Sequence, residues 1–550
     1  MPLPNKYTQR IMDKWANDAI YPKDGSKLVS IPKGLASFKI KDGTKIIGGN
    51  AFKNCSFLRS VVIPDSVTKI ESGAFLGCSS LQSIIIPNSV TEIEYGAFYF
   101  CSSLNSVVLP DSITEIERQT FQGCSSLLSV IIPNSVTKLE EWAFYGCSSL
   151  LSVVIPDSVT EIGYVTFCGC SSLQTVVLYD GIKEIKAETF SRCSSLLSVI
   201  IPDSVTHIWY KAFYGCSSLH SVVLPDSITE IEYGAFEGCF SLRSVAIPRN
   251  ISKIESRAFN GCSQLILDCK SSLFKVENNI LYSVAGDVIS CWSEDKKIEL
   301  SYGAKVIMVE VFKNCSSLQS MFIPDGVTEI GKEAFNNCSS LQSVVIPDSV
   351  TVIGELAFMD CISLQSVVIP NDVTVIEEGT FAGCAALQSI IIPNSVTKIG
   401  GMAFSFCSSL QSVVIPDSVT EIGDSAFSDC VSLQSVTIPN GVTVIEEVTF
   451  AGCTSLQSVI IPNSVTKIGH TVFSDCVSLQ SVVIPDSVTE IGDCAFVDCS
   501  SLQVVNISNN VTHIGYKAFS GCSSLQSVVI PKNTVVADNA FPETTTIIRK

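Results

Sequence analysis

The chain has 550 residues, of which 46% are hydrophobic and 16% are charged, and its formal net charge is −18. This apolar content excludes an intrinsically disordered chain. The acidic balance argues against a nucleic-acid ligand, because phosphate contacts need clustered Lys and Arg side chains. No apolar run approaches the roughly 18 residues that a membrane-spanning helix needs, so no membrane span is predicted.

The N-terminal residues 1–37 are predicted to form a cap that contains a hairpin. Within them, the stretch Gln9–Ile20 is predicted to be a short amphipathic helix that covers the hairpin. The first residues carry charges throughout and lack the apolar stretch of a secretory signal, so this part of the sequence favours a cytoplasmic location.

A repeat of 23 residues occupies most of the remaining chain, as the regular spacing of Pro64, Pro87 and Pro110 shows. A fixed period of this length is typical of solenoids, in which each unit buries its apolar side chains only against its neighbours. A first array of about ten repeats spans residues 38–263, and a second array of about eleven repeats, with a C-terminal cap, spans residues 301–550. The intervening residues 264–300 break the phase, and ILYS and VISCW around the turn Ala285–Asp287 predict a hairpin-like insert.

Each repeat places its apolar residues at fixed positions. The segment LQSVVI is predicted to contain a short parallel strand, and the following VTEI a second extended stretch. The segment DSAFSDC is predicted to form a tight helical turn. In one clean repeat the side chains predicted to point inward are Leu410, Val413, Ile415, Val419, Ile422, Phe427 and Cys430.

The repeat from Ile415 to Thr437 reads IPDSVTEIGDSAFSDCVSLQSVT and resembles the BspA-like leucine-rich repeats, whose pattern is IPxSVTxIGxxAFxxCxSLxxV. The resemblance runs from Phe38 to Phe541. It implies a leucine-rich-repeat solenoid, a right-handed superhelix that is β-rich with short parallel strands and helical turns. It also implies a cell-surface location and a role in adhesion to a host or a matrix.

Twenty of the 24 cysteines recur at one position of the repeat, from Cys55 to Cys262 and from Cys315 to Cys522. They are predicted to form a buried ladder of thiols, because Cys outside a disulfide packs as a small apolar side chain. Metal ligands must converge on a point, so this line of thiols predicts no metal site, and we expect no cofactor. The packed thiols favour a reducing compartment. No signature of a hydrolase, a metalloprotease or a phosphate-binding loop is present, so we predict no catalytic residues and no enzyme activity.

Aromatic side chains distinguish the first array from the second, which holds only Tyr302 and Tyr516 among its Tyr and Trp residues. Most of the aromatic residues of the first array fall just before or after the inward Phe, in positions that point outward. Clustered Tyr and Trp are typical of partner-binding hot spots, whereas the alternative is that they only cover the edge of the core. The candidate partner-binding residues are Tyr95, Tyr99, Trp142, Tyr145, Tyr164, Trp209, Tyr210, Tyr214 and Tyr233.

A second outward column lies within the strands, where Val62, Ile85, Val345 and Val414 are examples. It is either a continuous apolar contact face or a consequence of the strand preference of β-branched residues. The sequence therefore predicts a non-catalytic scaffold that binds a protein or a glycan, and leaves open a structural or self-assembling repeat protein.

Overall fold

The computed structural model describes residues 19–550 and consists of short parallel strands and turns, with no helix among these residues. The predicted helix Gln9–Ile20 lies outside the described residues except for Ala19 and Ile20. The chain divides into two compact units: unit 1 runs to Leu281 and includes Ser290–Trp292, and unit 2 comprises Tyr282–Ile289 and Ser293–Lys550.

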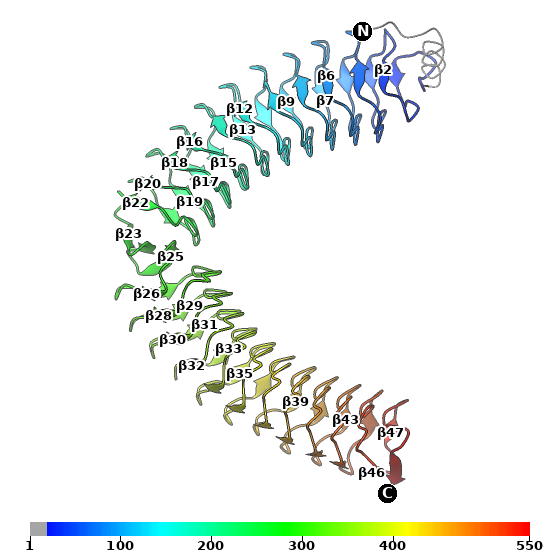
Figure 1. Ribbon diagram of the computed structural model, residues 1–550, viewed down its shortest axis with the longest axis vertical. Coiled ribbons are helices and arrows are strands. Elements are labelled where there is room, and N and C mark those ends of the chain that lie inside the picture. The colour runs from blue at the N-terminus through cyan, green and yellow to red at the C-terminus, as the bar shows by residue number, and fades with distance from the viewer. Residues whose placement is uncertain (1–18) are drawn as a thin grey trace. The chain divides into compact units, whose positions relative to one another are not determined.

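Each 23-residue repeat forms one turn of the solenoid, called a coil below. Each coil of unit 1 contributes one long and one short strand, and Figure 1 shows these strands stacked in chain order. The long strands are β2 (Ser37–Lys39), β4 (Ser60–Val62), β6 (Ser83–Ile85), β8 (Ser106–Val108), β10 (Ser129–Val130), β12 (Ser152–Val154), β14 (Thr175–Val177), β16 (Ser198–Ile200), β18 (Ser221–Val223), β20 (Ser244–Ile247) and β22 (Ile266–Cys269). The short strands are β1 (Lys27–Leu28), β3 (Ile46–Ile47), β5 (Lys69–Ile70), β7 (Glu92–Ile93), β9 (Glu115–Ile116), β11 (Lys138–Leu139), β13 (Glu161–Ile162), β15 (Glu184–Ile185), β17 (His207–Ile208), β19 (Glu230–Ile231) and β21 (Lys253–Ile254).

Unit 2 repeats this plan. Its long strands are β26 (Lys297–Glu299), β28 (Ser320–Phe322), β30 (Ser343–Val345), β32 (Ser366–Val368), β34 (Ser389–Ile391), β36 (Ser412–Val414), β38 (Ser435–Thr437), β40 (Ser458–Ile460), β42 (Ser481–Val483), β44 (Val504–Asn506), β46 (Ser527–Ile530) and β48 (Thr546–Arg549). Its short strands are β27 (Val306–Ile307), β29 (Glu329–Ile330), β31 (Val352–Ile353), β33 (Val375–Ile376), β35 (Lys398–Ile399), β37 (Glu421–Ile422), β39 (Val444–Ile445), β41 (Lys467–Ile468), β43 (Glu490–Ile491), β45 (His513–Ile514) and β47 (Val535–Val536).

Neighbouring coils pair in parallel at equivalent positions, as the partners Ser83 and Ser106 of β6 and β8 show. The residues between the arrays form β23 (Phe274–Glu277), β24 (Ile280–Ser283) and β25 (Asp287–Cys291), which are neighbours in one sheet. Both arrays begin with the same contact. The Tyr21 hydroxyl accepts a hydrogen bond from the Lys41 amide at 3.3 Å, and the Tyr282 hydroxyl accepts one from the Ser301 amide at 3.2 Å.

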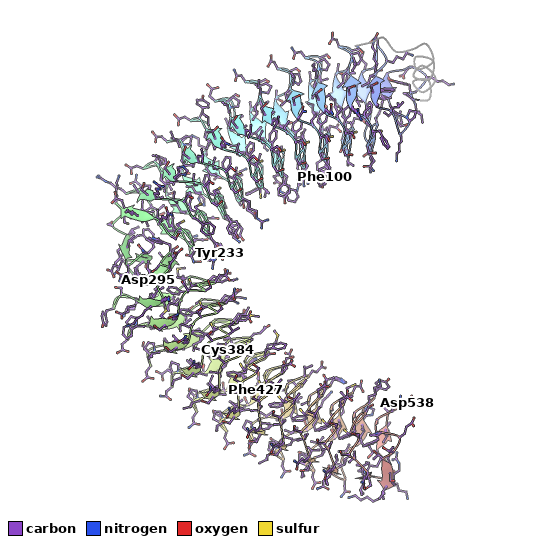
Figure 2. All side chains as sticks on the ribbon, in the orientation of Figure 1. Phe100, Tyr233, Asp295, Cys384, Phe427 and Asp538 are labelled. Carbon is purple, nitrogen blue, oxygen red and sulfur yellow. The ribbon has the colours of Figure 1, made fainter. Side chains whose placement is uncertain are left out.

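The core of each unit is a set of ladders that run from coil to coil. Leu410, Val413, Ile415, Val419 and Ile422 are all buried, as the sequence predicts. The inward Phe rings of neighbouring coils stack nearly parallel, with centroids 5.2 Å apart for Phe404 and Phe427. Figure 2 labels Phe427 in unit 2. Identical side chains therefore meet at every step, and each coil depends on its two neighbours for burial.

The buried cysteines form a second ladder beside the Phe rings. From Cys78 to Cys262 and from Cys338 to Cys522, the Sγ of each ladder cysteine donates to the carbonyl of the Phe in the preceding coil, for example Cys78 to Phe52 at 3.0 Å and Cys430 to Phe404 at 3.2 Å. Burial raises the pKa of the Cys124 thiol to about 12. The thiols therefore stay protonated, and the ladder is structural rather than reactive.

The prediction of a helical turn before each Cys is wrong. In the turn segment of one coil, Gly73 and Gly77 have positive φ values of 61° and 70°, which an α-helix does not allow. The Leu76 amide bonds to the Gly73 carbonyl at 2.9 Å, three residues back, and the Phe75 amide bonds to Ala97 of the next coil at 2.8 Å. Successive backbone amides thus donate in turn to a carbonyl of their own tight turn and to a carbonyl of the neighbouring coil. The continuous series of hydrogen bonds that defines an α-helix therefore does not form.

Candidate functional site

The turn segment positions the candidate aromatic residues at one edge of unit 1. Tyr95 directly precedes the first left-handed residue of its segment, Gly96, and Tyr99 follows the buried Phe98. Ala97 and Phe98 fill the core, so the residues on either side of this pair face outward. Tyr95, Tyr145, Tyr164 and Tyr210 are exposed, and Tyr99, Trp142, Trp209, Tyr214 and Tyr233 are half-buried.

The first group of aromatic residues surrounds Tyr99. Its ring packs edge-on against Phe100, with the centroids 4.4 Å apart, and Phe100 is 51% exposed. Tyr95 reaches across to the next coil and donates its hydroxyl hydrogen to Gln119 Oε1. Figure 2 labels Phe100 and Tyr233 at the edge that the turn segments of unit 1 form.

The second group is centred on Trp142. The Trp142 and Tyr145 rings are 6.0 Å apart, and the Arg118 guanidinium carbon lies 5.8 Å from the Trp142 ring centroid. Arg118 also forms an ion pair with Glu141 at 3.3 Å, which holds its guanidinium at the tryptophan. Tyr164, on the next coil, has the Lys186 ammonium 5.2 Å from its ring.

The third group is the most closely assembled. Tyr210 and Tyr233 stack across adjacent coils with centroids 5.7 Å apart. The Lys211 ammonium lies 5.0 Å from the Tyr210 ring, 5.1 Å from Tyr214 and 5.7 Å from Tyr233. These four residues are called the Lys211 cluster below. A cation among three rings is attracted by each ring face, so the cluster is held in place while its outer surface stays accessible.

Trp209 lies apart from the Lys211 cluster. Its ring stacks on His207 with the centroids 4.5 Å apart, and its Nε1 is buried without a hydrogen-bond partner in the described chain. Glu232 accepts a hydrogen bond from the Tyr210 amide at 3.0 Å and lies 3.0 Å from His207 Nε2. The Trp209 ring is half-buried beside His207.

Sequence reasoning missed Phe100, Arg118 and Lys211. The signal for Phe100 is its place before Cys101, a left-handed position (φ 57°) that Gly fills in many coils. A large apolar residue at a position that favours Gly carries a conformational cost, so Phe100 marks a departure from the repeat. The roles of Arg118 and Lys211 depend on contacts between coils, which a one-dimensional pattern does not show.

Within residues 19–550, the structure contains no group of three or more His, Cys, Asp or Glu side chains that could hold a metal ion. The same residues include no helix long and apolar enough to cross a membrane. The edge of unit 1 that carries the candidate aromatic side chains, from Tyr95 to Tyr233, is called the aromatic edge below. The interactions available there are stacking, cation–π attraction and hydrogen bonding, and these interactions bind a ligand without transforming it.

Parallel coils of 23 residues with inward Leu, Val, Ile, Phe and Cys at fixed positions define a leucine-rich-repeat solenoid. The chain belongs to the BspA-type leucine-rich repeat family: the family model described as a BspA type leucine rich repeat region (6 copies) matches residues 32–151, 143–266, 305–434 and 420–548. The family suggests a repeat scaffold for this chain, and leucine-rich-repeat families are generally non-enzymatic.

Among solved structures, a leucine-rich repeat protein of Bacteroides ovatus is 25% identical, with 96% of this chain and 97% of that chain covered and a TM-score of 0.32. A leucine-rich cell surface protein of Faecalibacterium prausnitzii is 24% identical, with 80% and 92% covered and a TM-score of 0.34. A leucine-rich repeat protein of Eubacterium ventriosum is 18% identical, with 62% and 83% covered and a TM-score of 0.43. No curated protein matches the sequence.

Proposed function

We propose that this scaffold binds a protein partner through the aromatic edge of unit 1. The observation that carries the proposal is the Lys211 cluster, in which three tyrosines from two adjacent coils surround one ammonium group. Tyrosine offers a large, rigid contact area and a polar hydroxyl at a low cost in side-chain entropy, which is why it is enriched at hot spots.

The extent of the aromatic edge suits a protein ligand. Tyr95 and Tyr233 lie six coils apart in the repeat. Parallel strands are spaced by about 4.8 Å, so the edge is roughly 29 Å long. A standard protein interface covers about 800 Å² on each partner, and an edge of this length provides one side of such a patch.

The test compares the parent with the triple variant Tyr210→Ser, Tyr214→Ser and Tyr233→Ser. A matched control is Tyr516→Ser, because Tyr516 stands at the position of Tyr210 and has the Lys517 ammonium 5.3 Å from its ring, but has no tyrosine neighbours in sequence-equivalent positions. A partner captured by the parent would be identified by mass spectrometry, purified, and measured against all three proteins by calorimetry.

We expect the triple variant to bind the purified partner at least about a hundredfold more weakly, because hot-spot residues contribute about 2 kcal/mol or more each and their losses are not additive. The Tyr516→Ser control should bind as the parent does. Binding by the triple variant within twofold of the parent would contradict the proposal.

A second candidate function is self-association through the strand face. The outward aliphatic column is strongly exposed, with Ile131 at 82% and Val414 at 77%. A second copy carries a column with the same spacing between coils, and the two columns could pack together. Sedimentation velocity at rising protein concentration tests this: an increasing sedimentation coefficient supports association, and a constant one rejects it.

A further inference from the structure

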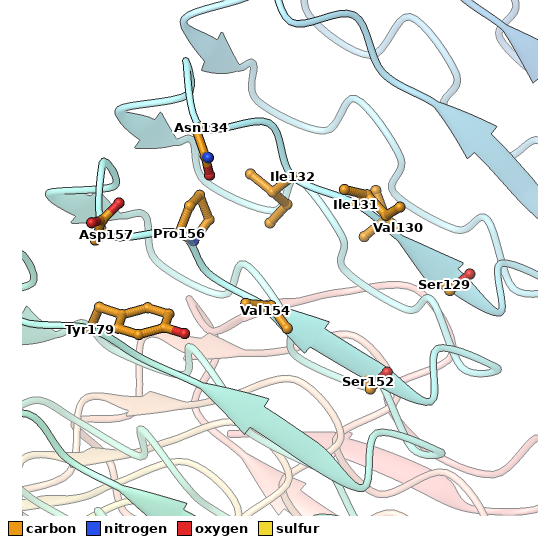
Figure 3. Close-up of a pocket in the computed structure, with 10 residues that line it drawn as sticks. All are labelled: Ser129, Val130, Ile131, Ile132, Asn134, Ser152, Val154, Pro156, Asp157 and Tyr179. Carbon is orange, nitrogen blue, oxygen red and sulfur yellow. The ribbon is translucent and has the colours of Figure 1, made fainter.

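A groove opens on the strand face of unit 1 where the repeat departs from its pattern. Tyr179 stands where the preceding and following coils have Pro156 and Pro202. The groove has a volume of about 570 Å³, and Figure 3 shows Tyr179 on one side of it and Ile131 on the other. It lies at the corner between a long and a short strand, a different corner of the coil from the aromatic edge.

Strand β10 borders the groove. Strand β10 ends at Val130, one residue earlier than its neighbours, and it pairs with β12 only through Ser129 and Ser152. Ile131 is the next residue after Val130 and is largely exposed. Together with Val154 it forms an apolar floor between the coils.

The walls of the groove combine one aromatic ring with hydrogen-bonding groups. The Tyr179 ring is 45% exposed and extends toward Val154 in Figure 3. Asn134 and Asp157, from adjacent coils, line the same groove and are both exposed. An amide offers donors and acceptors, and a carboxylate accepts hydrogen bonds from hydroxyl groups.

The charge of the groove restricts its ligand. Asp157 is the single charged side chain among the residues that line it, and no Lys or Arg lines it. An anionic ligand such as a phosphate, a sulfate or a uronic acid would meet repulsion without a compensating cation. The groove therefore suits a neutral molecule that has both hydroxyl groups and an apolar face.

We propose that this groove binds a neutral hexose unit of a glycan. The C–H face of a pyranose ring would stack on Tyr179, because polarised hydrogens are attracted to the electron-rich face of an aromatic ring. The hydroxyl groups at the edge of the sugar would donate to the Asp157 carboxylate and exchange hydrogen bonds with the Asn134 amide. A site of several hundred cubic ångströms with a few convergent polar groups is the usual form of a small-ligand site.

The test uses saturation-transfer difference NMR with maltohexaose, laminarihexaose, mannohexaose and hexa-N-acetylchitohexaose as neutral probes. Hexagalacturonate serves as the anionic probe, and a ten-residue polyproline peptide serves as the peptide probe. The key variant is Tyr179→Pro, which restores the residue found in both flanking coils and so preserves the backbone. The control is Tyr302→Ser, which removes an 83% exposed tyrosine of unit 2.

At least one neutral hexasaccharide should bind with a Kd on the order of millimolar, as expected for a single sugar site. Tyr179→Pro should weaken that binding by at least about tenfold through loss of the stacked ring, whereas Tyr302→Ser and the triple variant of the Lys211 cluster should leave it unchanged. Absence of binding by all four neutral probes, equal binding by Tyr179→Pro, or preference for the anionic or peptide probe would overturn the proposal. Because the Lys211 cluster is tested with separate variants, failure here leaves the proposed protein-binding edge intact.

Discussion

Raising the pH above about 9 is expected to unfold the arrays. Burial raises the pKa values of six consecutive ladder thiols in unit 2, and those of Cys361, Cys407 and Cys453 reach about 12. The other three members are Cys384, Cys430 and Cys476. An unfolded thiol has a pKa of about 8.5, so at alkaline pH the unfolded chain releases protons that the folded chain retains.

The direction and size of the effect follow from this difference. The folded pKa lies above the unfolded pKa, so the stabilisation is complete below about pH 8.5 and is lost as the pH rises toward 12. Each thiol then costs about 1.4 kcal/mol per pH unit, and six cost about 8 kcal/mol per pH unit. A free energy of unfolding of about 5–15 kcal/mol would fall to zero within one to two pH units, which places unfolding between about pH 9 and 10.5.

A variant with Cys384→Ser, Cys407→Ser and Cys430→Ser provides the control. Serine can donate to the same Phe carbonyls that accept from these thiols, but it does not ionise in this range. The free energy of unfolding should be measured by urea titration under reducing conditions at several pH values between 7.5 and 9.5 (about two pH units). Averaged over this range, across which the unfolded thiol passes from mostly protonated to mostly ionised, we expect the slope against pH to fall by about 2 kcal/mol per pH unit in the variant. An unchanged slope would show that the thiols do not govern alkaline stability.

Replacing Phe404 by Ala is expected to lower the free energy of unfolding of unit 2 by about 3–5 kcal/mol. The ring is fully buried and stacks on Phe381 and Phe427 at 5.6 and 5.2 Å. Its loss leaves a cavity between two coils and removes both ring contacts. Since each coil depends on its neighbours, the urea transition should also broaden or divide around the altered coil.

Phe406 offers a matched control two residues away. It is 60% exposed and occupies a left-handed position with φ 60°. Phe406→Gly removes the same ring but relieves a conformational cost of about 1 kcal/mol, so stability should stay unchanged or rise slightly. Comparable losses in the two variants would mean that the Phe404 stack does not hold the array together.

The contrast between Phe404 and Phe406 also shows what the sequence can and cannot predict. The 23-residue period identifies Phe404 and Cys407 as inward residues because their positions recur in nearly every coil. A short apolar segment such as AFSFC has no distinctive periodicity, so its own pattern does not reveal the left-handed turn between them. Gly73 and Gly77, four residues apart, were the available sign of two left-handed positions.

The candidate site was predictable only in part. The outward positions of Tyr210, Tyr214 and Tyr233 follow from the repeat, since they flank the inward Ala and Phe. The placement of Lys211 among the three rings depends on the stacking of adjacent coils and on a left-handed φ of 50° at Lys211. Likewise, Tyr179 in a proline position marks a departure from the repeat, but the groove beside it is lined by side chains of two other coils, among them Ile131 and Val154.

The central claim is that the aromatic edge is a recognition surface and not a cover for the core. Urea unfolding of the Tyr210→Ser, Tyr214→Ser and Tyr233→Ser variant beside the parent tests it without a partner. Surface rings that serve recognition should change the free energy of unfolding by no more than about 1 kcal/mol in total. A loss of about 3 kcal/mol or more, similar to that of a buried Phe, would show that the tyrosines protect the core and would contradict the proposed role.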